Sequence, residues 1–145
     1  MRIAVQEAPF DPGEVLAGIG RGDARLGAVV SFTGLVRADG GLEAMEIEHY
    51  PGMTERAIEA FAREAAARFG LGDVAVIHRF GRLVPGEAIM MVACAAPHRG
   101  DAFAAAEFLM DWLKSRAPFW KKEVGPGGAA WVAAKGEDEA ALGRW

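Results

Sequence analysis

The chain has 145 residues, 52% of them hydrophobic and 25% charged, with a formal net charge of −4. This size and composition predict one globular domain over residues 1–145 with a full core, and the acidic balance argues against general affinity for nucleic acids. The single cysteine, Cys94, excludes an internal disulfide framework, and the three scattered histidines show no metal-ligand spacing, so we expect neither a metal nor a bound cofactor.

The N-terminal part of the chain predicts two strands, a short helix and a loop. The first residues lack the layout of a signal peptide, and no run in the chain is apolar enough to span a membrane, which indicates a cytoplasmic protein. Residues 2–7 alternate as a strand, and DPGE at 11–14 supplies an N-cap, a proline at the first helical position and an acidic residue. Residues 26–34 are rich in β-branched and aromatic side chains, which predicts a buried strand before a glycine-containing mobile loop at 38–41.

The middle of the chain predicts a strand, a helix and a hairpin from its periodicity and its turn residues. The predicted elements are a half-exposed strand at 43–49, a helix from Thr54 to Gly70 or Gly72, and strands at 73–79 and 88–96 in a hairpin widened by residues 80–83.

The last part of the chain predicts a long helix and a second hairpin. Apolar residues at helical spacing follow PHRG at 97–100, and Pro118 forces the residue before it toward extended geometry, so the helix stops there. Residues 119–124 and 129–134 predict two strands around a GPGG turn. The polar tail, 135–145, predicts a loose helix.

Residues 97–122 form a locally basic segment on an acidic chain. They carry five positive and three negative side chains, a balance of +2, so the rest of the chain sums to −6. His98 and Arg99 lie where the predicted helix begins. The unpaired backbone N–H groups at a helix N-terminus favour an anion, and a guanidinium can hold a phosphate or a carboxylate by two hydrogen bonds. The plainer interpretation is a surface charge beside a loop residue, and spacing alone leaves both open.

Lysine is rare in this chain and is concentrated in the same segment. The chain has twelve arginines and four lysines, and three of the four are Lys114, Lys121 and Lys122. A titratable amine acts as a general acid, a general base or a nucleophile when burial and neighbouring cations lower its pKa. A solvated basic rim or chance clustering accounts for the same pattern about equally well.

Arg99 and Lys114 are fifteen residues apart, which is about 22 Å along one helix. The two ends of the helix therefore cannot both hold a small ligand within one chain. Either they serve different sites, or a two-fold dimer places His98 and Arg99 of one subunit beside Lys114 and Lys121 of the other. Apolar side chains on more than one face of the segment leave surface for such a contact, namely Phe108, Met110, Trp112 and Trp120.

Arg37 and Cys94 are the remaining residues with an obvious chemistry. Arg37 follows a predicted strand and precedes a loop, which suits a side chain that reaches into a cleft, and an exposed loop charge is about as plausible. Cys94 lies in an apolar run with no neighbouring base, so we expect a small buried hydrophobe and not a sulfur nucleophile. His49 and His78 belong to no motif and are expected to be strand residues.

Five motifs follow one another along nearly the whole chain. They are SFTGLVR (31–37), EIEHYPGMTE (46–55), VIHRFGRLVPGE (76–87), PHRGDAF (97–103) and FLMDWLKSRAPFWKKE (108–123), and the closing Arg144-Trp145 adds to them. Together they resemble the catalytic (large) subunit of molybdopterin synthase, the MoaE family. The resemblance implies an α+β fold of the α/β hammerhead type, with a largely antiparallel sheet, two main helices packed on it and a C-terminal hairpin.

The resemblance also implies an activity and two kinds of partner. The family forms a homodimer that binds one small ubiquitin-like sulfur-carrier subunit at each end, which makes a heterotetramer. It transfers sulfur from the carrier's C-terminal thiocarboxylate to cyclic pyranopterin monophosphate and so forms the molybdopterin dithiolene. No cysteine of this chain is needed for such chemistry, because the sulfur arrives on the partner.

The resemblance also implies roles for individual residues. Lys114 and Lys121 match the family's catalytic lysines. The implied substrate-binding residues are Leu35, Val36, Arg37, His98, Arg99, Lys114, Lys121, Lys122 and Glu123, with Lys122 and Glu123 completing the pocket wall beside Lys121. Met110 and Lys135 are further candidates, the latter because some members carry an arginine there that reaches toward the substrate.

Two functions of other classes stay open. One is a non-catalytic module that only docks a ubiquitin-like tail, and such a chain is expected to lose Lys114 or the His-Arg pair, which this chain keeps. The other is an RNA-binding domain that stacks bases on Trp112, Phe119 and Trp120. It predicts a steep salt dependence of RNA affinity, and the acidic remainder of the chain disfavours it.

Overall fold

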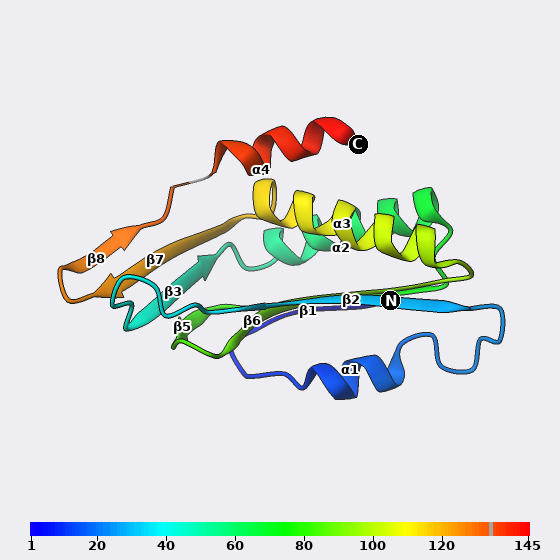
Figure 1. The fold of residues 1–145 in the computed structure, drawn as a ribbon, viewed down its shortest axis with the longest axis horizontal. Helices are drawn as coiled ribbons and strands as arrows, with labels where there is room; N and C mark the ends of the chain where they lie inside the picture. Colours follow the sequence, from blue (N-terminus) through cyan, green and yellow to red (C-terminus); the bar gives the residue numbers. More distant parts are fainter. Residues whose placement is uncertain (134) are drawn as a thin grey trace.

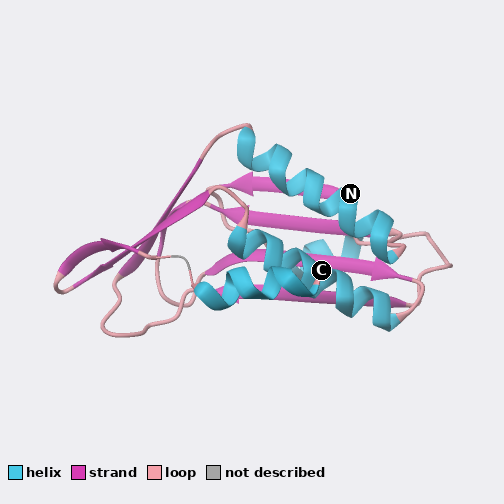
Figure 2. Cartoon of the chain, turned by 90° about the horizontal axis from the view of Figure 1, so that it is seen from above, coloured by secondary structure: helices cyan, strands magenta, loops and turns pink. Residues whose placement is uncertain are grey.

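Two four-stranded β-sheets with helices packed on them make up the fold (Figures 1 and 2). The structure is a computed structural model and describes residues 1–133 and 135–145. The first sheet has the strand order β1-β4-β6-β2. Its strands are, in that order, Arg2–Gln6, Asp73–Arg79, Ala88–Ala96 and Ala28–Leu35. β1 pairs with β4 in parallel, and the other two pairs are antiparallel.

The second sheet lies beyond one end of the first, at the left of Figure 1, and has the strand order β5-β3-β7-β8. Its strands are, in that order, Gly81–Leu83, Ala44–His49, Phe119–Gly125 and Gly128–Trp131. Every pair in it is antiparallel. The sheets are therefore largely antiparallel, as predicted.

Helices cover both faces of the first sheet (Figure 1). α2 (Met53–Phe69) and α3 (Arg99–Ser115) lie on one face, and α1 (Pro12–Gly18) lies on the other. α4 (Gly136–Ala141) and the 3₁₀ turn Leu142–Arg144 lie over α3. The central strands are thus buried on both sides, which explains why the sequence of β6 is a continuous apolar run.

Strand alternation divides the core into two layers. Val74 and Val76 of β4 belong to the layer beneath α2 and α3, and Ala75 and Ile77 belong to the layer beneath α1. All four side chains are at most 3% exposed. β4 therefore aims its even-numbered side chains at the long helices.

The predicted helix boundaries have local causes. Asp11 caps α1, since its carboxylate accepts a hydrogen bond of 2.9 Å from the N–H of Gly13. Gly70 ends α2 with a φ of 64°, in the left-handed region that favours glycine. α3 ends at Ser115, shortly before Pro118, as the proline requires.

The predicted fold class is confirmed, with two corrections to individual elements. Residues 26–34 do not form a buried strand, because β2 is at the edge of the first sheet, and Val29, Phe32 and Leu35 are 48%, 43% and 56% exposed. Residues 80–83 do not widen the hairpin of β4 and β6, because β5 leaves that sheet and pairs with β3. An apolar pattern predicts that a strand is buried, but it does not show which other element packs against that strand.

The C-terminal hairpin and tail follow the prediction. β7 and β8 pair antiparallel, and the predicted strand at 129–134 corresponds to β8, with residue 134 outside the described part of the chain. α4 and the 3₁₀ turn form the helix predicted for the tail. Among the residues described, no helix combines the length and the apolarity that crossing a membrane requires.

Candidate functional site

Three of the four lysines gather where α3, β7 and the start of α4 meet. Lys114 is in the last turn of α3, Lys121 is on β7, and Lys135 immediately precedes α4. Burial lowers the pKa of Lys121, and the nearby ammonium groups of Lys114 and Lys135 lower it further, while Asp138 opposes them. This combination favours a neutral, reactive amine at Lys121.

The strand geometry of β7 decides which of its residues join this cluster. β7 pairs with β3, and Phe119, Lys121 and Glu123 share one of its faces by alternation. Lys122 lies on the other face, with its ammonium 3.9 Å from the carboxylate of Glu46 and 4.9 Å from the ring centre of Trp131. The structure therefore does not bring Lys122 into the lysine cluster within one chain.

A buried histidine lies beside the cluster. His78, at the end of β4, is 4% exposed, and its ring stacks on Phe119 at 3.7 Å and 17°. Burial lowers the pKa of His78 to about 3, and Lys121 and His49 contribute to the same direction. His49 packs on Phe80 and exchanges a 3.1 Å hydrogen bond with Thr54.

The tail of the chain holds Lys135 and Asp138 in place. The hydroxyl of Ser115 donates a hydrogen bond of 2.9 Å to the carbonyl of Asp138, and Arg116 pairs with Glu139. These contacts tie α4 to the C-terminal end of α3. They therefore bring a carboxylate and a third lysine to the two lysines that the sequence predicted.

Arg37 lies two residues past the end of β2, in the loop that leads to β3 of the second sheet. Leu35 is exposed, whereas Val36 is buried and exchanges backbone hydrogen bonds with Glu87 and Gly86 at 2.9 and 2.8 Å. The Arg37 guanidinium is exposed and lies 3.3 Å from Asp39. Its side chain thus extends into solvent from a well-fixed backbone, and an anion that binds there must compete with the exposed carboxylate of Asp39.

His98 and Arg99 lie at the opposite end of α3 from Lys114. His98 is the residue that precedes the helix, Arg99 is its first residue, and both are exposed. The length of α3 therefore separates His98 and Arg99 from Lys114, as the helical rise predicts. Within one chain, this pair does not reach the lysine cluster.

Two other residues singled out from the sequence, Met110 and Cys94, pack in or against the core. Met110 lies one turn before Lys114 on α3 and is partly buried against the core. Cys94 is fully buried, and burial raises the pKa of its thiol to about 12. A thiol with such a pKa is not a nucleophile at neutral pH, which agrees with its predicted role as a small hydrophobe.

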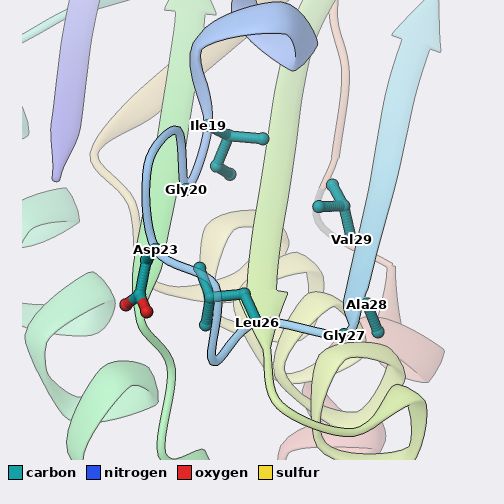
Figure 3. A pocket seen from close by; sticks show the side chains of 7 residues that line it. All are labelled: Ile19, Gly20, Asp23, Leu26, Gly27, Ala28 and Val29. Carbon is teal, nitrogen blue, oxygen red and sulfur yellow. The ribbon is translucent and has the colours of Figure 1, made fainter.

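A cavity of about 320 Å³ lies beside the start of β2, and no lysine belongs to its lining (Figure 3). It is lined mainly by backbone and by the aliphatic side chains of Ile19, Leu26 and Val29. Asp23 is the charged group of this lining, and its carboxylate pairs with Arg25 at 2.9 Å. The cavity therefore offers little chemistry, and the lysine cluster is the better candidate site.

Sequence reasoning missed His78 and Asp138 as neighbours of the lysines. For His78 the sequence did contain a hint. His78 is an even-numbered residue of β4, like Val74 and Val76, so its side chain points to the same face of the strand as theirs. For Asp138 there was no such hint, because the fold of the tail over α3 cannot be read from a short polar segment. Within residues 1–133 and 135–145, no three His, Cys, Asp or Glu side chains gather as a metal ion would need.

Comparison with known proteins assigns the family. The family model described as "MoaE protein" matches residues 5–116, which is most of the chain. The chain belongs to the MoaE family. It is 68% identical to the molybdopterin synthase catalytic subunit of Cereibacter sphaeroides over 146 residues, a match that covers both chains completely.

Solved structures of MoaE relatives have the same fold. The MoaE protein of Burkholderia ambifaria matches with a TM-score of 0.86 and 51% identity, over 99% of this chain and 97% of that one. A chain from the complex of subunits 1 and 2 of the molybdopterin-converting factor of Helicobacter pylori matches with a TM-score of 0.77 over 92% of this chain and 91% of that one. Its identity of 18% supports the likeness in fold alone.

Proposed function

We propose that this MoaE-family chain is the catalytic subunit of a molybdopterin synthase. It transfers sulfur from the C-terminal thiocarboxylate of a small ubiquitin-like carrier to cyclic pyranopterin monophosphate, and so forms the dithiolene of molybdopterin. The observation that carries the proposal is the lysine cluster, in which a desolvated Lys121 lies beside Lys114. The 68% identity to a chain named molybdopterin synthase catalytic subunit supports the same activity.

Lys114 and Lys121 are the proposed catalytic residues. A lysine with a lowered pKa has access to two forms. As an ammonium it can polarise the acyl thiocarboxylate or hold the carboxylate that remains after sulfur leaves, and as a neutral amine it can form a transient covalent link with the carrier or the substrate. Lys135 adds a third cation to the same place, as its proximity to Lys121 supports. The sulfur comes from the carrier, so the buried Cys94 has no part in the reaction.

The substrate is an anionic pterin phosphate, and cationic groups are proposed to bind it. Arg37 extends from the end of β2 and can hold the phosphate at two points, while Leu35 and Val36 shape the adjoining wall. His98 and Arg99 add a proton-transfer group and a second guanidinium at the N-terminus of α3, where backbone N–H groups favour anions. These two come from the neighbouring subunit, because α3 separates them from Lys114 of their own chain.

The edge strand β2 offers the surface for this neighbour. Val29, Phe32 and Leu35 are exposed along it, with Val29 and Phe32 on opposite faces of the strand, and a monomer gains nothing from exposing such apolar side chains. β2 begins beside Ala96, close to Arg99, and runs in the direction of α3. A two-fold axis that pairs two β2 edges antiparallel therefore carries His98 and Arg99 toward the Arg37 and Lys114 end of the partner.

The structure supports some of the other proposed pocket residues better than others. Glu123 shares the face of β7 that carries Lys121, and Met110 lies one turn from Lys114, so both suit the wall of the pocket. Lys122 is paired with Glu46 on the opposite face, so its role requires contact with a partner chain on that side. A cytoplasmic location and a single domain over the whole chain remain predictions of the sequence.

The deciding experiment mixes the protein with a thiocarboxylated carrier and cyclic pyranopterin monophosphate and measures dithiolene formation. We expect product with the natural chain and a rate lowered about 100-fold or more with Lys114→Ala. Arg63→Ala is the matched control, because it removes an exposed cation that pairs with Glu59 on α2. Binding of the carrier without product in the natural chain would instead support a docking module.

A further inference from the structure

The imidazole of His78 lies next to the lysine cluster, and the roles proposed above leave it unused. It is the last residue of β4 on the face that carries Val74 and Val76, and it is 4% exposed. A buried polar ring has a cost unless its surroundings use it, because it gives up the hydrogen bonds of water. Its neighbours therefore indicate what it does.

One ring nitrogen of His78 fixes the state of the whole ring. Nδ1 lies 2.8 Å from the carbonyl oxygen of Arg79. A carbonyl oxygen can only accept, so Nδ1 carries the hydrogen and Nε2 of the neutral ring carries a lone pair. The lowered pKa, about 3, keeps the ring neutral near pH 7.

The stack of His78 on Phe119 connects the ring to Lys121. The two rings are nearly parallel, with 3.7 Å between their centres. Phe119 and Lys121 are two positions apart on β7 and therefore share a face, about 7 Å from each other. The charges of Lys121 and His49 both act on His78, so the imidazole lies within their reach.

We propose that His78 is a positioning residue for Lys121, and that its ring forms an uncharged floor that keeps the Lys121 amine out of water. The inference rests on the proposed function only in taking Lys121 to be a catalytic amine. The ring is fixed in two directions, since the Arg79 carbonyl holds its edge and Phe119 covers its face. It can therefore exclude water without moving.

The charged and titratable groups around Lys121 and His78 come from several elements. Lys114 of α3, and Lys135 and Asp138 at the start of α4, act on Lys121, whereas Lys121 and His49 of β3 act on His78. An uncharged His78 adds no cation and no counter-charge to this set. Its contribution to Lys121 is therefore desolvation, which favours the neutral amine.

Two substitutions separate the ring from its hydrogen bond. His78→Asn retains a donor near the position of Nδ1 but removes the stacked ring, whereas His78→Phe retains a stacked apolar ring but removes the donor. The readout is the pKa of Lys121, measured by NMR of the lysine ¹³Cε signals during a pH titration. The chain has four lysines, so the spectrum is simple, and the Lys121 signal is the one lost in Lys121→Arg.

We expect the pKa of Lys121 to rise toward the ordinary lysine value in His78→Asn and to stay low in His78→Phe. Ile77→Ala is the matched control, because it truncates a fully buried side chain of the same strand on the opposite face and should leave the Lys121 signal unchanged. The inference is overturned if His78→Asn leaves Lys121 unmoved, if His78→Phe raises its pKa equally, or if Ile77→Ala does so.

The experiment stands apart from the proposed function. It uses the full chain and needs neither carrier nor substrate, so a chain without sulfur-transfer activity can still show the effect. Each variant can overturn the inference by itself, because a folded His78→Phe protein must keep the low pKa of Lys121 and a folded His78→Asn protein must lose it. Failure of one variant to fold therefore leaves the other as a test.

Discussion

The indole N–H of Trp145 donates a hydrogen bond of 2.6 Å to the carboxylate of Asp111, 34 positions earlier in the chain. Arg144 adds two more hydrogen bonds to the same carboxylate, each of 3.0 Å. The ring of Trp145 packs edge-on against Phe69 and Phe108. The end of the chain is thus fixed to α2 and α3, and α4 is held between this anchor and the lysine cluster.

Replacing Asp111 with alanine should release this anchor. Asp111 is 8% exposed and accepts three hydrogen bonds, so we expect its loss to lower the free energy of unfolding by about 2–3 kcal/mol, measured by urea denaturation. Glu107→Ala is the control, because Glu107 pairs with Arg144 at the surface and should cost less than about 1 kcal/mol. Equal losses in the two variants would mean that the anchor contributes no more than a surface ion pair.

Much of the fold follows from local signals in the sequence. The start of α1 at Asp11, the end of α2 at Gly70 and the stop before Pro118 are set by residues that lie within a few positions of each boundary. The separation of Arg99 from Lys114 also follows from helix geometry alone. These features were predictable because each depends on neighbours in the sequence.

Features that depend on distant partners could not be predicted. β2 has the composition of a core strand, yet the edge of a sheet exposes it, because no further strand among residues 1–133 and 135–145 pairs with its outer side. His78 and Phe119 stack although they lie on different sheets, and nothing local to either residue indicates the other. The resemblance placed Lys122 beside Lys121, but strand alternation separates the two side chains.

Cys94 provides a test of where the sulfur comes from. Its thiol has a pKa of about 12 because it is buried, so we expect Cys94→Ala to retain sulfur transfer at a stability cost of about 1 kcal/mol. Lys114→Ala should instead lower the rate about 100-fold or more, measured as dithiolene formation with a thiocarboxylated carrier. The reverse pattern, an inactive Cys94→Ala and an active Lys114→Ala, would refute the proposed mechanism.

The buried His78 should make the fold sensitive to acid. Its pKa is about 3 in the folded chain and 6.5 ordinarily, so between these values the unfolded chain binds a proton that the folded chain does not. Stability from this group is complete above pH 6.5 and declines as the pH falls, by about 2 kcal/mol between pH 7 and pH 5.

Urea denaturation of the natural chain and of His78→Phe at both pH values measures this contribution. Other groups titrate in both proteins, so the difference between the two losses isolates His78. We expect the variant to lose about 2 kcal/mol less than the natural chain over this interval. Identical losses would show that His78 takes up its proton in the folded state as readily as in the unfolded chain.

Subunit mixing tests whether the two ends of α3 serve different active sites. Arg99→Ala and Lys114→Ala should each be inactive as a pure dimer, but a mixed dimer has one site that receives both natural residues. Random exchange makes half of the dimers mixed, so we expect about a quarter of the natural dithiolene-forming activity to return. Mixing Lys114→Ala with Lys121→Ala is the control, since both lysines belong to the same half of a site and no intact site can form. If the first mixture stays as inactive as the control, His98 and Arg99 do not act across the subunit boundary, and α3 is not shared between two sites.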